Sequence, residues 1–254
     1  MLESIITTCQ DLLYSFPEAE NIRKYIENRI SNSAIKEFQL GYYPNKSNLS
    51  LFTNMFSDQD LIKTGLFYYR IIEGEKTLSS TLENHNIVMP YKDAYGKVIA
   101  IVGRTIFSDD EKKENNISKY KNSSFKKANH LFGLWRAKSS IIKNNCVFVV
   151  EGQFDCINAI SNGIENCVCL GSGSMTFNQF SILSRYTNNI IMLLDNDEAG
   201  NIGSKKAISN FNDRSEVNIF EARLPDGYKD LDQFICDEKT YAVNYVNSLI
   251  VNRK

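Results

Sequence analysis

Residues 147–155 have the sequence Val-Phe-Val-Val-Glu-Gly-Gln-Phe-Asp, in which a short apolar run ends at Glu151. A second apolar run, Ile190–Leu194, leads directly into Asp-Asn-Asp-Glu-Ala-Gly at residues 195–200. A third acidic cluster, Lys-Asp-Leu-Asp-Gln, occupies residues 229–233. Carboxylates at the ends of buried strands are costly unless they face water or a cation. Several such clusters at one edge of a sheet therefore predict a divalent metal held for phosphate chemistry.

The second half of the chain alternates apolar runs with helical segments. The apolar runs lie at residues 147–150, 167–170, 190–194 and 217–222, and helical patterns follow the first three of them. This alternation is typical of a parallel sheet with helices on its faces, so we expect an α/β fold. Ligands gather at the carboxyl ends of the strands in such sheets. Glu151 and Asp195 both fall at such ends.

The first half of the chain has a different pattern. Apolar spacing predicts that residues 1 to about 80 are mostly helical. Residues 87–90 and 97–102 are expected to form two strands joined by a turn at 93–96. The polar residues 108–124 are expected to form a mobile surface loop.

The overall charge of the chain is balanced. Its 254 residues have a formal net charge of -1, so contact with a polyanion requires a local basic patch. No run is long and apolar enough to span a bilayer, and the N-terminus has no signal-peptide pattern. The six cysteines include no Cys-x-x-Cys pair, so we expect no zinc site, reduced thiols and a cytoplasmic location.

The acidic residues after the two strands suit a hard cation. Asp195 and Asp197 are two residues apart and can converge on one ion. Mg²⁺ fits this set because it prefers carboxylate oxygens and keeps several of its waters. Glu151 could be a further ligand or a proton acceptor. Alone, the Asp-x-Asp-x-x-Gly pattern fits a solvated turn equally well, but a second acidic motif after its own strand favours the metal site.

These two motifs together resemble the Toprim domain, a metal-binding fold of bacterial-type primases, type IA and II topoisomerases and some nucleases. Other segments resemble the DnaG-like primases in the family's order, and they lie at residues 25–29, 38–42, 103–104, 118–123, 125–127, 131–134, 170–173 and 224–232. The resemblance implies a Toprim parallel sheet flanked by helices and preceded by an N-terminal α+β subdomain. The expected divisions are 1–140 for the N-terminal primase-core subdomain, 141–236 for the Toprim catalytic domain and 237–254 for a C-terminal helix.

The resemblance also implies a role for each matching residue. Glu151, Asp195 and Asp197 would be the catalytic acids and metal ligands, and Asp230 and Asp232 would be further metal ligands. The positions that would meet nucleotide phosphates or the template are Arg104, Lys119, Asn122 and Lys127. The expected cofactor is Mg²⁺ or Mn²⁺, with two or more ions per site and no zinc in this chain.

The chain departs from the family pattern in three ways. Leu231 stands between Asp230 and Asp232, where the family usually has proline. The family usually begins with a zinc-binding domain, whereas this sequence starts almost at the catalytic core. It usually ends with a helical helicase-binding domain, whereas only about twenty residues follow the last motif here. We interpret the chain as a catalytic core alone, either a compact viral or mobile-element primase or a shortened one.

The expected function is that of a DNA primase, a DNA-directed RNA polymerase that makes short RNA primers on single-stranded DNA during replication. The expected partners are the single-stranded template, ribonucleoside triphosphates and a replicative helicase. We expect a monomer without membrane association, in the cytoplasm of a bacterium or of a phage-infected host. Two alternatives stay open, a Toprim-type metal-dependent nuclease and a non-catalytic replication accessory protein that keeps only the fold.

Overall fold

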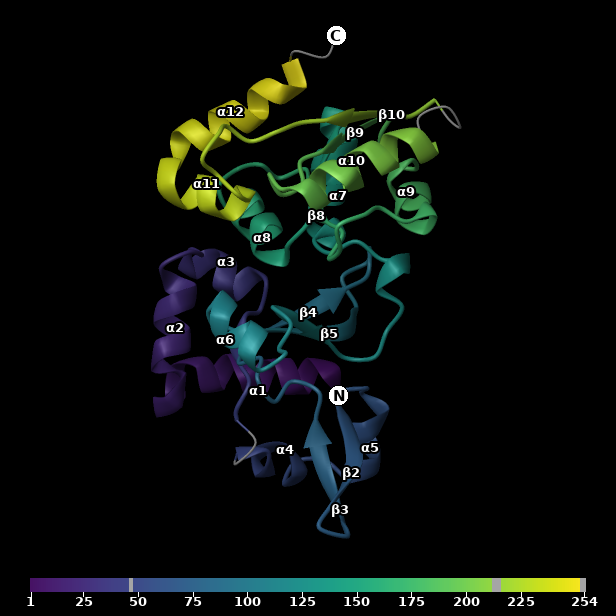
Figure 1. The fold of residues 1–254 in the computed structure, drawn as a ribbon. Coiled ribbons are helices and arrows are strands. Elements are labelled where there is room, and N and C mark those ends of the chain that lie inside the picture. The colour runs from purple at the N-terminus through teal and green to yellow at the C-terminus, as the bar shows by residue number, and fades with distance from the viewer. Residues whose placement is uncertain (46–47, 212–215, 252–254) are drawn as a thin grey trace. The chain divides into compact units, whose positions relative to one another are not determined.

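The computed structural model describes residues 1–45, 48–211 and 216–251. Its internal contacts divide the chain into two compact units (Figure 1). The N-terminal unit contains Met1–Tyr91 and Val98–Phe125, and the C-terminal unit contains Lys92–Lys97 and Lys126–Lys254. The contacts therefore group residues 126–140 with the C-terminal unit, and the division at residue 140 stays a prediction.

The C-terminal unit is built on a four-stranded sheet with the strand order β10-β9-β7-β8. All three neighbouring pairs are parallel. The strands are β7 (Val147–Val150), β8 (Cys167–Cys169), β9 (Asn189–Met192) and β10 (Asn218–Glu221). Each lies within or next to one of the four apolar runs, so the predicted α/β class and its parallel sheet are confirmed.

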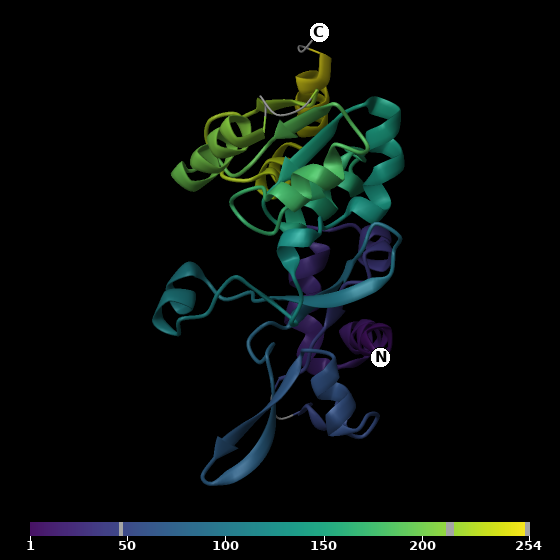
Figure 2. The same cartoon turned by 90° about the vertical axis from the view of Figure 1, so that its right-hand side faces the viewer.

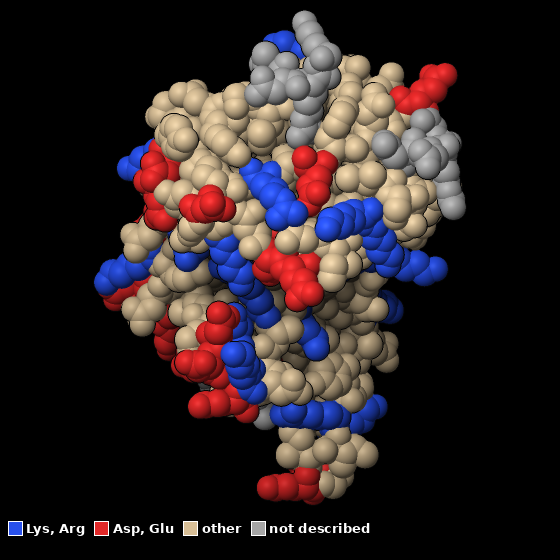
Figure 3. All heavy atoms as spheres, turned by 45° about the horizontal axis from the view of Figure 1, so that its top comes forward, with Lys and Arg blue, Asp and Glu red and all other residues tan. Residues whose placement is uncertain are grey.

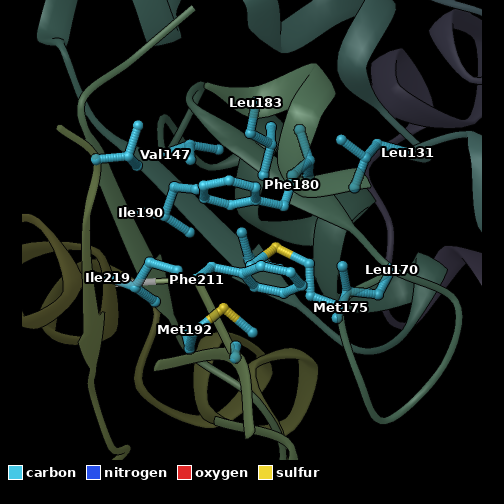
Figure 4. Packing of buried hydrophobic residues seen from close by; sticks show 14 of the residues in the cluster. Leu131, Val147, Leu170, Met175, Phe180, Leu183, Ile190, Met192, Phe211 and Ile219 are labelled. Carbon is cyan, nitrogen blue, oxygen red and sulfur yellow. The ribbon is translucent and has the colours of Figure 1, made fainter. Parts of the chain in front are cut away.

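Helices flank this sheet (Figure 2). They are α7 (Leu134–Asn144), α8 (Gln153–Ser161), α9 (Phe177–Leu183), α10 (Glu198–Phe211), α11 (Leu231–Glu238) and α12 (Thr240–Val251), with a 3₁₀ turn, η3 (Lys127–Asn129), before them. Helices α7, α9 and α10 share a core with one face of the sheet, in which the rings of Phe180 and Phe211 stack with centroids 4.6 Å apart (Figure 4). Since successive strand residues face opposite sides, Ile191 belongs to the other face, where Ile250 of α12 lines a hollow with it.

The N-terminal unit contains a second four-stranded sheet, in the order β1-β4-β5-β6. Its strands are β1 (Gly41–Tyr42), β4 (Ile87–Lys92), β5 (Val98–Arg104) and β6 (Tyr120–Asn122). The turn between β4 and β5 is closed by a hydrogen bond of 3.0 Å from the Asp93 N–H to the Lys97 carbonyl, and Gly96 has a φ of +89° there. The strands and turn predicted for residues 87–102 are confirmed.

The helices of the N-terminal unit are α1 (Leu2–Ser15), α2 (Glu20–Glu27), α3 (Asn32–Glu37), α4 (Ser50–Thr53), α5 (Asp58–Lys63) and α6 (Asp109–Glu114), with a 3₁₀ turn, η1 (Pro17–Ala19). Helix α1 buries Ile5, Ile6 and Cys9 on one face and packs against β1 and β5. A Cβ at Gly41 would lie 2.6 Å from the Cys9 carbonyl carbon. Glycine at this position therefore permits the close approach of β1 to α1.

The prediction that residues 1 to about 80 are mostly helical is wrong for its last part. Strands β2 (Phe67–Ile72) and β3 (Glu75–Ser80) form a separate antiparallel ribbon. Their two-residue turn has positive φ at both Glu73 (51°) and Gly74 (85°). Such turns favour Asn, Asp or Gly at both positions, so glutamate at the first one weakens the sequence signal for a hairpin.

The loop predicted for residues 108–124 is also wrong in part, because this segment contains α6 and β6. Helix α6 begins with a capping box in which Ser108 and Glu111 bond each other's backbone N–H groups. No residue of this helix is buried. Apolar periodicity therefore could not indicate it, and the local signals are the capping residues, the acidic first turn and the basic last turn.

On the face shown in Figure 3, acidic and basic side chains are interspersed, in agreement with the balanced composition. In the described part of the chain, no helix is long and apolar enough to cross a membrane.

Candidate active site

Two of the predicted acids lie at the carboxyl ends of neighbouring strands. Glu151 directly follows β7, and Asp195 lies shortly after β9. The two strands are still paired near their ends, because the Leu193 N–H donates to the Val149 carbonyl over 2.9 Å. Both carboxylates are half-buried. The parallel sheet therefore brings the two acidic motifs to the same edge, as predicted.

The start of α10 packs tightly against this edge. A Cβ at Gly200 would lie 2.1 Å from the Asp195 carbonyl oxygen, and a Cβ at Gly203 would lie 2.0 Å from the Gly173 carbonyl oxygen. Gly173 in turn lies beside the Glu151 carboxylate, whose Oε2 would be 3.7 Å from a Cβ placed there. The two glycines of α10 thus allow one helix end to contact the backbone at Asp195 and at Gly173, which lies beside the Glu151 carboxylate. Asp197 is exposed and accepts the Gly200 N–H over 2.9 Å.

Asn196 lies between Asp195 and Asp197, and its hydrogen bonds connect their turn to the segment that precedes α11. Its backbone N–H donates to the Lys229 carbonyl over 2.7 Å. Its side-chain amide donates to the carbonyls of Leu224 (3.1 Å) and Tyr228 (3.0 Å). The turn that carries Asp195 and the segment that leads to Asp230 are therefore held together by three hydrogen bonds.

The third acidic cluster forms the start of α11. Asp230 is the N-cap, and its carboxylate accepts the Gln233 N–H over 2.8 Å. Leu231 is the first helical residue, a position that proline also suits because the N–H there needs no partner within the helix. The departure from the family pattern at Leu231 therefore leaves the helix start intact. Asp232 is buried and accepts the Asn158 side-chain amide over 3.1 Å.

A further carboxyl group, which was not among the predicted site residues, lies among these acids. Asp155 on α8 is buried and accepts the Asp232 N–H over 2.8 Å. Burial raises the pKa of Asp155 well above its usual value, and the charges of Asp230, Asp232 and Asp195 raise it further. Four carboxyl groups from three segments thus share one electrostatic environment. The sequence motif at 151–155 contained Asp155, but only its packing against α11 shows that it belongs to this group.

The predicted phosphate contacts are divided between the two units. In the N-terminal unit, Arg104 is buried, and its guanidinium donates to the hydroxyls of Tyr120 (2.7 Å) and Tyr25 (2.8 Å). Lys119 is exposed and Asn122 is half-buried on β6. In the C-terminal unit, the Lys127 amine donates to the Gly171 carbonyl over 2.5 Å. The Gly171 N–H donates to the Glu151 carbonyl over 3.0 Å, so Lys127 is tied to the segment beside the acids.

The acids match the chemistry of a hard divalent cation, although they are not arranged as a closed ligand shell. Among residues 1–45, 48–211 and 216–251, no group of three or more His, Cys, Asp or Glu side chains has the spacing of a metal-binding cluster. Carboxylate oxygens are nevertheless the ligands that Mg²⁺ prefers. Burial and then the charges of Asp230, Asp232 and Asp195 raise the pKa of Asp155, and a cation beside these acids would offset their charge.

Both units match known families along most of their length. Residues 148–235 match the family described as Toprim-like, and residues 10–138, half of the chain, match the family described as DNA primase catalytic core, N-terminal domain. The chain belongs to the DnaG-type primase catalytic-core family. This confirms the resemblance drawn from the motifs.

Individual primases show the same relationship. The DNA primase of Aquifex aeolicus is 33% identical over 213 residues, which are 84% of this chain and 41% of that protein. The DNA primase of Lactococcus lactis is 28% identical over 242 residues, 94% of this chain and 36% of that protein. The chain therefore spans about two fifths of the length of these curated relatives.

Solved primase structures have the same fold. The zinc-binding and RNA polymerase domains of the Aquifex aeolicus primase superpose with a TM-score of 0.79 at 30% identity, covering 99% of this chain and 59% of that one. A DnaG primase catalytic domain bound to single-stranded DNA gives a TM-score of 0.79 at 26% identity, covering 98% of this chain and 79% of that one.

Proposed function

We propose that this chain is the catalytic core of a DNA primase and makes short RNA primers on single-stranded DNA during replication. The observation that carries the proposal is that Glu151 and Asp195 follow neighbouring parallel strands, and that the turn of Asp195 is hydrogen-bonded to the segment before Asp230, in a chain of the primase family. In the reaction, the 3′-hydroxyl of the growing primer attacks the α-phosphate of a ribonucleoside triphosphate. A new phosphodiester forms and pyrophosphate leaves.

The carboxylates would hold the divalent metal on which Toprim primase cores generally depend. Glu151, Asp195 and Asp197 are the proposed catalytic ligands, and Asp230 and Asp232 are further ligands. When bound, Mg²⁺ or Mn²⁺ supplies positive charge that offsets the phosphate charge. We further propose two or more ions per site. Glu151, which is half-buried directly after β7, would ligate the metal or accept a proton.

The basic residues would position the nucleic acid and the nucleotide. Lys127 is tied through Gly171 to the segment that carries Glu151, which supports a role at a phosphate near the reaction centre. Arg104, Lys119 and Asn122 would contact the template or nucleotide phosphates. The related DnaG catalytic domain was solved with single-stranded DNA bound, which supports a template-binding role for this fold.

The partners and cellular setting complete the proposal. Besides the template, we infer that the chain uses ribonucleoside triphosphates and acts with a replicative helicase, as a monomer in the cytoplasm. The divisions proposed for its domains are 1–140, 141–236 and 237–254.

A primer-synthesis assay separates this function from its alternatives. The purified chain is incubated with single-stranded DNA, labelled ribonucleotides and Mg²⁺ or Mn²⁺, with and without a replicative helicase. A primase yields short labelled RNA that requires both template and metal. A Toprim-type nuclease shortens the DNA and incorporates no label, and a non-catalytic accessory protein does neither.

A further inference from the structure

Helix α8 carries a buried amide that contacts the third acidic cluster. Asn158 lies three residues after Asp155 on this helix, so the two side chains lie on the same face of it. Both are buried, with exposed fractions of 2% for Asn158 and 6% for Asp155. The helix packs against α11 (Figure 1). A buried amide without hydrogen-bond partners would cost folding free energy, so the partners of Asn158 indicate its role.

Asp155 and Asn158 together hold the first turn of α11 at two points. Asp155 accepts the backbone N–H of Asp232 over 2.8 Å, and the Asn158 Nδ2 donates to the Asp232 Oδ1 over 3.1 Å. The first N–H groups of a helix have no partner within the helix, so an acceptor from a neighbouring helix stabilises this turn. One face of α8 therefore fixes both the backbone and the carboxylate of Asp232.

The orientation of the Asn158 amide is set from its other side. Asn162, one turn later, donates its side-chain amide to the Asn158 Oδ1 over 2.8 Å. The oxygen of Asn158 is thus engaged by Asn162, and its nitrogen is the atom that is directed to Asp232. The second partner of that nitrogen is the Cys236 Sγ, at 3.4 Å. A reversed amide would place two acceptors against each other, so the network specifies a donor beside the Asp232 carboxylate.

Helix α8 also connects the first acidic motif with the third. It begins at Gln153, two residues after Glu151, and it carries Asp155 and Asn158 within its first two turns. The position of the Asp232 carboxylate is therefore set relative to the segment that carries Glu151. Groups that orient a metal ligand without touching the metal commonly change metal affinity about 10–100-fold when they are removed.

We propose that Asn158 is a positioning residue of the acidic edge. Its amide holds the Asp232 carboxylate in place for the divalent cation, and Asn162 orients that amide. The proposal rests on the proposed function, because Asp232 is a proposed metal ligand. Asn158 acts only through Asp232, since its own nitrogen and oxygen are engaged by Asp232 and Asn162. The competing explanation is that the amide only closes the contact between α8 and α11.

The test measures Mn²⁺ binding to the full chain by electron paramagnetic resonance, without nucleotides or DNA. Asn158→Leu keeps the approximate shape of the side chain and removes the donor, and we expect the Mn²⁺ affinity to fall about 10-fold. Ser161→Ala is the matched control. The Ser161 hydroxyl donates to the Asn158 backbone carbonyl over 3.1 Å and not to its side chain, so this variant should bind Mn²⁺ as the wild type does.

A double-mutant cycle shows whether Asn158 acts through Asp232. In the background of Asp232→Ala, Asn158→Leu should lower the Mn²⁺ affinity by no more than about 2-fold, because the carboxylate that it orients is absent. A residue that only closes the helix contact would lower the affinity equally in both backgrounds, and that result overturns the proposal. An unchanged Mn²⁺ affinity in Asn158→Leu, with a native circular dichroism spectrum, also overturns it.

Substitution of Asn162 tests the orientation of the amide. The carboxylate of Asn162→Asp can only accept, so it should attract the Asn158 nitrogen and turn the Asn158 oxygen toward Asp232. We expect the Mn²⁺ affinity to fall about 5-fold, and wild-type affinity in this variant would refute the role of Asn162. Primer synthesis is measured separately. If the wild type makes no primers but the cycle shows the coupling, only the proposed function fails, and if primers are made but Asn158→Leu binds Mn²⁺ normally, only the role of Asn158 fails.

Discussion

The acidic edge of the C-terminal unit and the exposed lysines Lys113 and Lys121 of the N-terminal unit place charge in opposite ways. At the acidic edge, Asp155 and Asp232 are buried, and the charges around Asp155 have the same sign. Such an arrangement costs folding free energy that hydrogen bonds from neighbouring groups only partly offset. Lys113 and Lys121, by contrast, are exposed and cost the fold little. Substitutions at the acidic edge should therefore change both chemistry and stability, whereas substitutions of these two lysines should leave stability nearly unchanged.

The largest effect is expected for Asp195→Ala. Loss of this proposed metal ligand should lower primer synthesis by about 100-fold or more. The free energy of unfolding should be unchanged or slightly raised, because one like charge near Asp155 is removed. Primer yield and urea unfolding measure the two quantities. Asp237→Ala, which removes an exposed carboxylate of α11, should leave both as in the wild type, and full primer yield from Asp195→Ala would refute the site.

The packing of α10 gives the next largest effect. In Gly203→Ala the new methyl group would lie 2.0 Å from the Gly173 carbonyl oxygen, so the backbone must shift. We expect the free energy of unfolding to fall by about 1–3 kcal/mol, as for other overpacked sites. Primer synthesis should also fall, because Gly173 lies beside Glu151. Lys205→Ala on the exposed side of the same helix should change neither by much, and equal behaviour of the two variants in urea would contradict the close contact.

Asn196→Ala separates the effect of position from the effect of charge, because it disturbs the turn that carries Asp195 and changes no charge at the acidic edge. Two donated side-chain hydrogen bonds are lost, which should cost about 1–2 kcal/mol of unfolding free energy. The Mg²⁺ concentration for half-maximal synthesis and the affinity for Mn²⁺, measured by electron paramagnetic resonance, should both shift toward weaker binding. Asn178→Ala, which loses a surface hydrogen bond to Asn129, is the control and should leave metal affinity unchanged.

The smallest effect concerns pH and His85, whose ring is hydrogen-bonded to the Ser118 carbonyl. Burial lowers the pKa of His85, Lys121 lowers it further, and the hydrogen bond with the Ser118 carbonyl opposes them. The folded protein therefore binds this proton less readily than the unfolded chain, so stability is fully present above the ordinary pKa of 6.5 and falls as the pH drops below it. Urea midpoints at about pH 7.5 and about pH 5.5 should differ less in His85→Gln than in the wild type.

His130 allows the same measurement of pH dependence in the C-terminal unit. Burial also lowers the pKa of His130, while Asp93 opposes the shift. His130→Gln should therefore remove a further part of the pH dependence. Identical pH dependence in the wild type and His85→Gln would show that His85 titrates equally in the folded and unfolded protein.

The two units also differ in how far the sequence predicts their structure. In the C-terminal unit each strand lies within or next to an apolar run, because the sheet is covered on its faces, and these runs are enough to locate the strands. In the N-terminal unit, β2 is only partly buried and α6 has no buried residue. In the sequence, only a hairpin turn indicates β2, and a capping box indicates α6. These patterns predict secondary structure less reliably than an apolar face does.

The candidate site was predictable where acids directly follow strands. Glu151 and Asp195 could be located because an apolar run precedes each of them. Asp155 could not be singled out, since its burial depends on α11, and the N–H that it accepts belongs to a residue 77 positions later. Arg104 was expected from its motif, but its enclosure by Tyr25 and Tyr120 depends on tertiary contacts that spacing does not show.

Asp230 both caps α11 and contributes negative charge near Asp155, and an alanine substitution removes both at once. Alanine there would remove the negative charge and also free the first turn of α11, which carries Asp232, at a cost of about 1 kcal/mol for the lost cap. Asparagine retains the capping oxygen and deletes only the charge. A loss of activity in Asp230→Ala could therefore come from unwinding of α11 or from the lost charge. The variant Asp230→Asn keeps the cap, so it measures the effect of the charge alone.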